Sequence, residues 1–291
     1  MADARAKTDP DFTALTLHSP GGASAQVCPH GAHVLGWRPA GTTRERLFLS
    51  TASHYAPGCA IRGGIPVIFP QFSGFGPLPK HGFARNLVWT ARPRDGSSRV
   101  VFELRDTPAT RILWPHAFEA LLSIILGDDT LTTTLCVRNT GGTACAFTAA
   151  LHTYLAVDDI AAVRVRGLQG RPFLDATDAM RAALETRPAL RFDGEFDRVF
   201  VAAPDSVVLE DGVARVTVER SGFADLVIWN PGATKAAALS DMETDGYRRM
   251  LCIEPAVFEP PVRLAPGAEW NGTQVLRYED VAGAEPASAD S

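Results

Sequence analysis

The chain has 291 residues, of which 46% are hydrophobic and 21% are charged, so it can bury a large core and a disordered chain is not expected. Its 33 acidic and 28 basic residues give a net charge of -5, which disfavours a broad surface for nucleic acid. The sequence contains no apolar run of about 18 residues and no apolar segment typical of a signal peptide, so we expect a soluble, cytoplasmic protein without membrane contact.

Many short segments alternate between apolar and polar residues, which is typical of half-buried antiparallel strands. In chain order they cover residues 12–17, 86–93, 99–105, 118–126, 130–139, 144–155, 206–220, 224–230 and 273–279, with an Asp-Gly turn at Asp211. One flat sheet rarely carries so many strands, so the sequence predicts a large antiparallel β-sandwich of two stacked sheets.

Two segments have helical signals. Residues 175–185 begin with Asp175, a residue able to cap a helix, and residues 231–242 are rich in alanine after a proline. Both are short, so we expect them to decorate loops of an all-β protein.

No linker, repeat or low-complexity block interrupts residues 12–278, which favours one β domain over residues 1–278. Residues 279–291 are small and polar, and we expect them to be disordered. The five cysteines are odd in number and widely spaced, so we expect reduced thiols, no disulfide framework and no zinc site. We expect a monomer.

Residues 60–85 gather arginines, glycines, prolines and aromatic residues. Pro66 and Pro70 exclude a helix there, and the paired glycines that follow Arg62 permit close backbone approaches that a side chain would block. The guanidinium groups of Arg62 and Arg85 can bind one phosphate through several charge-assisted hydrogen bonds. The segment therefore predicts a local anion site in a cleft of an acidic protein.

An extended backbone over residues 81–85 would place His81 and Arg85 on one face, with their Cα atoms roughly 13 Å apart. Both side chains would then grip opposite ends of a small ligand. The alternative is that each arginine pairs with a surface carboxylate. For Gln71 the sequence favours neither of two roles: a hydrogen-bond donor to a sugar hydroxyl, or a side chain that forms the hydrogen bonds of a turn.

His152 and Glu254 are polar residues within apolar strands. A buried carboxylate has a raised pKa and can accept a proton, whereas an imidazole can donate one, so together they fit acid/base catalysis. The alternative is a core histidine and a carboxylate bonded to a neighbouring strand. The sequence does not show whether the two residues meet.

Other polar residues carry weaker signals. Asp197 lies in an acidic and aromatic turn, where it could bind a sugar hydroxyl or pair with an arginine. Trp229 and Asn230 could contact a sugar, although a tryptophan at a strand end is more often part of a core. Five histidines have no constellation around them and are expected to be structural or exposed: His18, His30, His33, His54 and His116.

Six motifs in order along residues 12–278 carry a family resemblance: "AIRGGIPVIFPQF", "HGFARN", "LHTYLAVDDI", "GEFDRVF", "VIWNP" and "MLCIEPA". They resemble the D-hexose-6-phosphate mutarotases, or glucose-6-phosphate 1-epimerases, of the wider aldose 1-epimerase group. The resemblance implies the galactose mutarotase type of β-sandwich. It also implies a hexose 6-phosphate as substrate and no cofactor or metal.

Carried over by position, the resemblance implies that Glu254 removes the proton of the anomeric hydroxyl while His152 protonates the ring oxygen. It assigns His81 to holding the sugar ring, and Asp197 to sugar hydroxyls. It implies a 6-phosphate site formed by Arg62 and Arg85. One departure is Lys80, where the family more often has glutamine before His-Gly.

The sequence thus predicts an isomerase that interconverts the α and β anomers of glucose 6-phosphate and other hexose 6-phosphates. One alternative is an aldose 1-epimerase of free sugars, with Arg62 and Arg85 in structural ion pairs. Another is a non-catalytic sandwich that binds a sugar phosphate. The sequence does not rank the hexose 6-phosphates.

Overall fold

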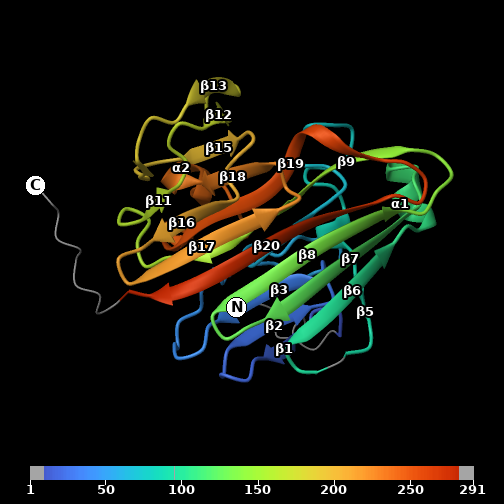
Figure 1. The fold of residues 1–291 in the computed structure, drawn as a ribbon, viewed down its shortest axis with the longest axis horizontal. Coiled ribbons are helices and arrows are strands. Elements are labelled where there is room, and N and C mark those ends of the chain that lie inside the picture. The colour runs from blue at the N-terminus through green and yellow to red at the C-terminus, as the bar shows by residue number, and fades with distance from the viewer. Residues whose placement is uncertain (1–9, 95, 282–291) are drawn as a thin grey trace, which may run out of the picture.

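The computed structural model describes residues 10–94 and 96–281, which form three sheets with antiparallel neighbours throughout (Figure 1). The three-stranded sheet contains β1 (Leu15–His18), β2 (Ser24–Cys28) and β3 (His33–Arg38). The eight-stranded sheet has the order β13 (Arg181–Leu184), β12 (Pro172–Asp175), β15 (Phe196–Phe200), β18 (Asp225–Asn230), β19 (Met250–Leu264), β9 (Cys145–Leu151) and β4 (Val67–Ile68), with β10 (Tyr154–Ala156) also paired to β19.

The nine-stranded sheet has the order β14 (Ala189–Leu190), β11 (Arg164–Arg166), β16 (Ser206–Glu210), β17 (Ala214–Ser221), β20 (Glu269–Asp280), β8 (Thr130–Asn139), β7 (Phe118–Leu126), β6 (Arg99–Arg105) and β5 (Thr90–Ala91). Short helices decorate the loops: α1 (Pro108–Leu113), α2 (Gly232–Ala237) and the 3₁₀ turns η2 (Ala84–Asn86) and η3 (Gly246–Arg249). The predicted all-β sandwich is confirmed.

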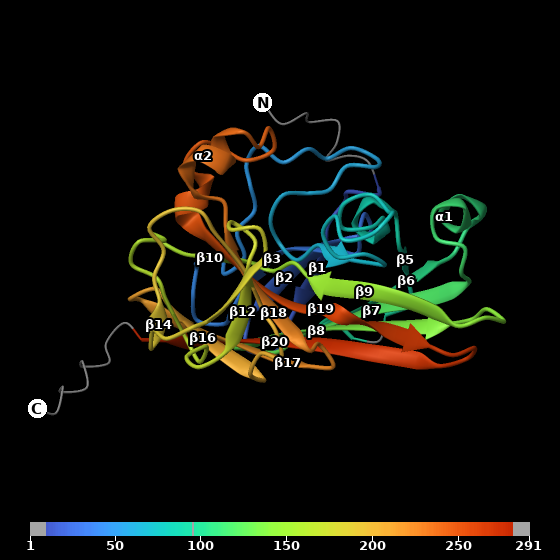
Figure 2. The same cartoon turned by 90° about the horizontal axis from the view of Figure 1, so that it is seen from above.

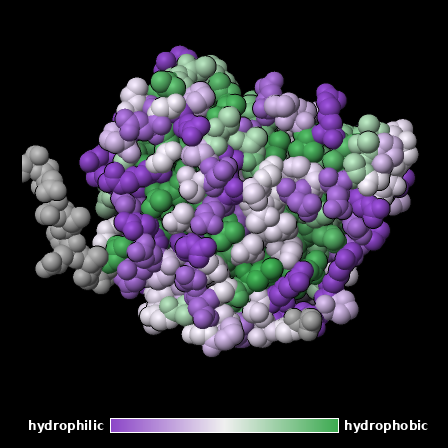
Figure 3. All heavy atoms as spheres, in the orientation of Figure 1, coloured by the Kyte–Doolittle hydropathy of each residue, from purple (hydrophilic) through white to green (hydrophobic). Residues whose placement is uncertain are grey.

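The nine-stranded and eight-stranded sheets are stacked, and α2 lies on the side of the eight-stranded sheet away from the nine-stranded one (Figure 2). Strands β6, β7 and β8 alternate between buried and more exposed residues, as their sequence predicts. Inward residues such as Phe102, Leu122 and Leu135 join one apolar cluster, to which all three sheets contribute. On the outer face of this sheet, hydrophilic and hydrophobic residues are interspersed (Figure 3).

Strand β19 has two different faces. Leu251 and Ile253 belong to the large apolar cluster between the sheets. Cys252 and Glu254 alternate with them and therefore point to the opposite face. This outer face of the eight-stranded sheet carries the candidate site.

The helix expected over residues 175–185 is wrong. Asp175 ends β12, a turn follows, and residues 181–184 form β13. Pairing of both strands in the eight-stranded sheet overrides the helix propensity of the alanines. The helix expected within residues 231–242 is confirmed in part, since α2 covers six of them.

Helix α1 was not predicted. Thr107 and Thr110 form a reciprocal capping box, and Pro108 occupies the first turn. The short segment contains no apolar stripe long enough to indicate a helix from the sequence.

The Asp-Gly turn at Asp211 joins β16 to β17, as predicted. Residues 279 and 280 belong to β20, so the prediction of a disordered tail over residues 279–291 is wrong at its first two residues. Residues 282–291 lie outside the described part, and their expected disorder stays a prediction.

The five cysteines are free thiols. No helix within residues 10–94 and 96–281 is long and apolar enough to span a membrane.

Candidate active site

A cavity of about 200 Å³ opens on the outer face of the eight-stranded sheet. Its floor comes from β15, β18 and β19, and its walls come from residues 72–85, the β12–β13 turn and the α2 segment. Six of the seven residues that the sequence assigns to catalysis or substrate binding line it together: Arg62, His81, Arg85, His152, Asp197 and Glu254. Segments far apart in the chain therefore converge as the sequence reading requires.

His152 and Glu254 meet because β9 and β10 both pair with β19. Ala150 lies opposite Ala256, and Tyr154 lies opposite Cys252. His152 falls in the break between β9 and β10, at the position opposite Glu254. Its Nδ1 atom lies 3.3 Å from Oε1 of the carboxyl group.

Burial shifts the pKa of both groups towards their neutral forms. Glu254 is 2% exposed, and burial followed by the nearby charge of Asp197 raises its pKa well above the usual value. Burial lowers the pKa of His152 well below 6.5, helped by His81, Arg85 and Arg62. In this neutral pair the carboxylic acid keeps its O–H and the imidazole one N–H, so each residue has both a hydrogen-bond donor and an acceptor.

The extended backbone expected between His81 and Arg85 is wrong. His81 has a left-handed φ of 68°, and residues 84–86 form η2. His81 still faces the cavity, and its Nδ1 atom accepts a hydrogen bond from the Ser73 amide at 3.3 Å. Burial first, and then Arg85, lower the pKa of His81 to about 2, so the ring is neutral and its Nε2–H is a donor.

The paired glycines permit the close approach that the sequence predicts. A Cβ atom on Gly63 would overlap the Phe48 carbonyl, and one on Gly64 would overlap the Val34 carbonyl. Arg62 is thereby fixed at the edge of the cavity. His33, expected to be structural, supports this turn through a 2.8 Å contact between Nε2 and the Gly63 oxygen.

Arg62 is held by two residues that the sequence did not reveal. Its Nη2 atom lies 3.0 Å from Oδ2 of Asp241, and Nη1 donates to the Tyr154 hydroxyl at 2.9 Å. Burial alone lowers the pKa of the guanidinium, but Tyr154 and Asp241 together raise it. Arg62 thus forms an ion pair within the protein, which is what the alternative of an aldose 1-epimerase of free sugars expects of this arginine.

Arg85 differs from Arg62 because, in residues 10–94 and 96–281, its side chain makes one hydrogen bond, from Nη2 to the Lys80 carbonyl at 3.2 Å. Within the described part of the chain, the buried Nε atoms of Arg62 and Arg85 both lack a hydrogen-bond partner. Burial lowers the pKa of Arg85. Two guanidiniums with unpaired donors at one cavity form a site suited to an oxyanion.

Two lysines also line the cavity, Lys80 from the loop and Lys235 from α2. Lys235 pairs with Glu195 at 2.7 Å. Asp197 faces the same space, and burial raises its pKa to about 6 despite the nearby lysines. The cavity thus combines cationic groups with a carboxyl group that titrates near neutral pH.

Gln71 does not line the cavity, so its assignment to substrate binding is wrong. Its amide nitrogen donates to the carbonyls of Ser73 and Leu78, and its oxygen accepts from the Leu78 amide. Gln71 therefore shapes the 72–80 loop, which is the turn alternative. A single glutamine in a glycine-rich sequence gives no signal that separates these roles.

Trp229 lines the cavity, whereas Asn230 turns away from it. The Asn230 amide donates to the carbonyls of Tyr247 and Met250, and its oxygen accepts from the Gly232 amide. Asn230 therefore holds the start of α2 and the η3 segment in place.

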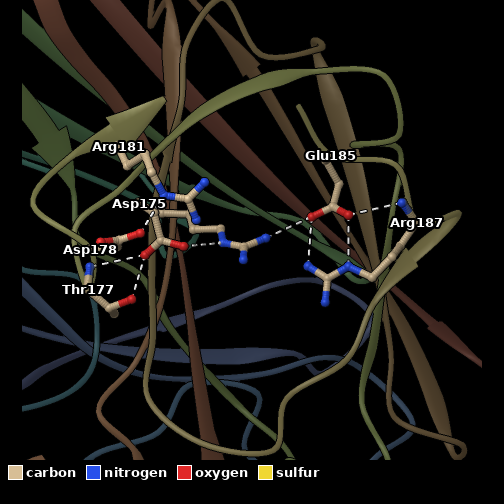
Figure 4. Close-up of polar contacts among 7 residues, drawn as sticks. Asp175, Thr177, Asp178, Arg181, Glu185 and Arg187 are labelled. Atoms are coloured by element: carbon tan, nitrogen blue, oxygen red, sulfur yellow. Dashed lines mark hydrogen bonds and ion pairs between the residues drawn. The ribbon is translucent and has the colours of Figure 1, made fainter. Parts of the chain in front are cut away.

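Asp175 ends β12 and lies in an ion-pair network beside the β12–β13 turn (Figure 4). Arg198 lies between two carboxylates: its Nε atom is 3.1 Å from Oδ2 of Asp175, and its Nη1 atom is 2.9 Å from Oε2 of Glu185. Arg187 pairs with the same Glu185 oxygen at 2.7 Å. Asp175 also accepts from the Thr177 amide and hydroxyl, which shapes the turn that adds Ala176 and Met180 to the cavity. Asp175 is neither a helix cap nor a ligand-facing group.

The chain is similar to known proteins in both sequence and structure. Residues 13–277 match the family model described as aldose 1-epimerase. A protein of Cenchrus ciliaris described as a "putative glucose-6-phosphate 1-epimerase" is 37% identical over 93% of this chain and 86% of its own length. A Salmonella typhimurium protein with the same description is 35% identical over 83% of this chain and 85% of its own length.

Solved structures agree with the sequence matches. The crystal structure of a "putative mutarotase" from Salmonella typhimurium has a TM-score of 0.84 and 31% identity, covering 92% of this chain and 90% of that one. A "galactose mutarotase related enzyme" from Lactobacillus acidophilus has a TM-score of 0.77 at 17% identity, covering 94% of this chain and 100% of that one. The second likeness concerns the fold alone.

Proposed function

Because the chain belongs to the aldose 1-epimerase family, whose mutarotases act on sugars, we propose that it interconverts the α and β anomers of glucose 6-phosphate. Related hexose 6-phosphates are included in the proposal. The single observation that carries it is one cavity that holds the His152–Glu254 pair together with Arg62 and Arg85.

In the proposed reaction the carboxylate of Glu254 takes the proton of the anomeric hydroxyl, and the imidazolium of His152 gives a proton to the ring oxygen. The bond between C1 and the ring oxygen breaks as the C1 carbonyl forms. Rotation about C1–C2 and reclosure, with the proton transfers reversed, yields the other anomer. The two oxygens share one carbon, which suits two groups 3.3 Å apart.

The proton balance supports this role for the pair. Burial favours a carboxylic acid beside a neutral imidazole, whereas ring opening starts from the carboxylate and the imidazolium, so the carboxyl proton must first pass to the imidazole within the pair. Both arrangements hold the same number of protons. Ring opening converts one arrangement into the other, and ring closure restores the first. The reaction therefore needs no proton from the solvent during turnover.

The phosphate group has a second effect in this proposal. Arg62 and Arg85 lower the pKa of His152, besides the larger effect of burial. A phosphate dianion bound to both guanidiniums offsets their charge and so raises the pKa of His152 towards its ordinary value. The phosphorylated substrate would then favour the acid form of His152 as well as bind more tightly.

Exchange spectroscopy on the anomeric proton signals tests the proposal. The protein should accelerate anomer exchange of glucose 6-phosphate at a much higher kcat/KM than that of glucose. Equal acceleration of both sugars would favour an aldose 1-epimerase of free sugars. Binding of glucose 6-phosphate without faster exchange would favour a non-catalytic sandwich.

A further inference from the structure

We propose that His152, Cys252 and Glu254 form a binding site for a thiophilic divalent cation such as Zn²⁺ or Cd²⁺, and that this cation blocks the catalytic pair. The cysteine spacing in the sequence gave no sign of a metal site. The fold nevertheless places a thiol beside an imidazole and a carboxyl group, and their ligand atoms all lie within 4.8 Å of one another.

Strand geometry brings the three groups together. Cys252 and Glu254 are two residues apart on β19, so their side chains point to the same face of the sheet. Cys252 lies opposite both Tyr154 on β10 and Trp229 on β18. His152 stacks on the Tyr154 ring with a centroid distance of 4.8 Å, which holds its imidazole above this part of β19.

Two polar atoms of the cluster are buried without a hydrogen-bond partner in residues 10–94 and 96–281. They are Oε2 of Glu254 and Nδ1 of His152, whose 3.3 Å contact with Oε1 of Glu254 is not aligned as a hydrogen bond. The two residues are 7% and 2% exposed, so water does not freely solvate these atoms. Buried polar atoms without partners indicate a place for a ligand.

The donor set fits a soft divalent cation. One thiolate, one imidazole and one carboxylate are ordinary zinc ligands, with bond lengths of about 2.0–2.3 Å, and thiolate favours soft metals over Mg²⁺ or Ca²⁺. The side chains must draw together by roughly 1 Å to reach such bond lengths, which small changes in their χ angles allow. Because His152 and Glu254 line the cavity, the fourth position faces the substrate space.

Binding exchanges protons for the cation. The Cys252 thiol and a protonated Glu254 each release a proton as the metal bonds form, so the affinity for the cation rises with pH. A bound cation occupies the acceptor oxygen and the imidazole at once. This consequence rests on the proposed function, because only then are the two groups the acid and the base of turnover.

A cadmium titration tests the site independently of catalysis. The starting protein carries Cys59→Ala and Cys136→Ala, which removes the two thiols that are not buried. Titration with Cd²⁺ should give the ultraviolet absorption of a cadmium–thiolate bond, saturating at about one ion per chain. Adding Cys252→Ala or Cys252→Ser should abolish this signal, whereas adding Cys145→Ala, which removes another buried thiol, should leave it.

Anomer exchange supplies the second arm. Zinc should inhibit the starting protein, and the zinc concentration for half inhibition should rise roughly tenfold or more in Cys252→Ser, each rate taken relative to the same protein without metal. Saturating glucose 6-phosphate should weaken cadmium binding in the starting protein.

The two arms separate the proposals. A cadmium–thiolate signal that survives Cys252→Ala and Cys252→Ser, or no signal in the starting protein, would overturn the metal site. A normal signal in a protein that does not exchange anomers would overturn the proposed function alone. Thermal melting of each variant shows that the comparison concerns folded protein.

Discussion

Replacing Arg85 by methionine tests whether this arginine reads the phosphate group. The change keeps a long apolar side chain and removes the charge. In the described structure Arg85 has no carboxylate partner, and its buried Nε atom is unpaired, so the folded protein loses little besides the donation to Lys80. The effect should therefore concentrate on the phosphorylated substrate.

The magnitude follows from hydrogen bonds to a charged group, which contribute about 1.5–3 kcal/mol. At about 1.4 kcal/mol for each factor of ten, kcat/KM for glucose 6-phosphate should fall roughly 10-fold to 150-fold. Exchange of glucose should not fall, because glucose has no phosphate to bind and the loss of the Arg85 charge shifts the pKa of His152 upward, towards its acid form. The assay is anomeric exchange spectroscopy over a range of both sugars.

Arg99→Met is the matched control, because Arg99 is exposed on β6 in the nine-stranded sheet, away from the cavity. It should leave both substrates unaffected. Equal losses of activity on glucose and glucose 6-phosphate in Arg85→Met would refute phosphate recognition by Arg85, and so would an unchanged activity on glucose 6-phosphate.

Three further changes probe charges around the site. Asp197→Asn should remove a rise of kcat/KM with pH near 6, which is the pKa of the Asp197 carboxyl group. The substrate phosphate titrates in the same range, but its contribution is common to the parent and the variant. A pH profile identical to that of the parent would contradict a role of the Asp197 carboxylate in turnover. His33 has a pKa of about 3 in the folded protein, against 6.5 for the free group, so between these pH values the unfolded chain binds one more proton and stability falls as the pH drops. His33→Gln should reduce this slope of the unfolding free energy by about 1.4 kcal/mol per pH unit, measured by denaturant melts at several pH values. An equal slope in the variant would be inconsistent with a buried neutral His33. Arg198→Met should lower the free energy of unfolding by roughly 1–3 kcal/mol while Arg187→Met changes it much less, and equal effects would argue against Arg198 as the centre of the network.

The strands could be predicted where one face of a sheet is buried. Residues 99–105 and 130–139 alternate so regularly that β6 and β8 begin and end where the pattern does. Residues 118–126 form β7 with the same alternation of burial, although Leu121 and Ile125 make both of its faces apolar. Side chains alternate between the two faces of a strand, and one face packs against the core, so the local sequence alone indicates such a strand.

Local propensity failed where distant residues decide the backbone. Residues 175–185 contain good helix formers, yet Arg198 on β15 holds Asp175 and Glu185 in a strand–turn–strand unit. His81 adopts a left-handed conformation within a loop that Gln71 fixes. Neither constraint is visible in the residues next to it.

The site could be predicted as a set of residues but not as a geometry. His152 and Glu254 meet only because β9, β10 and β19 pair in one register, which a single sequence does not reveal. Tyr154 and Asp241 were missed for the same reason, since each acts on Arg62 across more than 90 positions of the chain.

The Glu254→Gln variant gives the most direct test of acid/base catalysis by the His152–Glu254 pair. Glutamine keeps the shape of the side chain and cannot accept the proton. Anomeric exchange of glucose 6-phosphate should fall by roughly 10²-fold to 10⁴-fold, while calorimetry still detects binding of the sugar phosphate. Exchange at the parent rate in a folded Glu254→Gln protein would contradict the account.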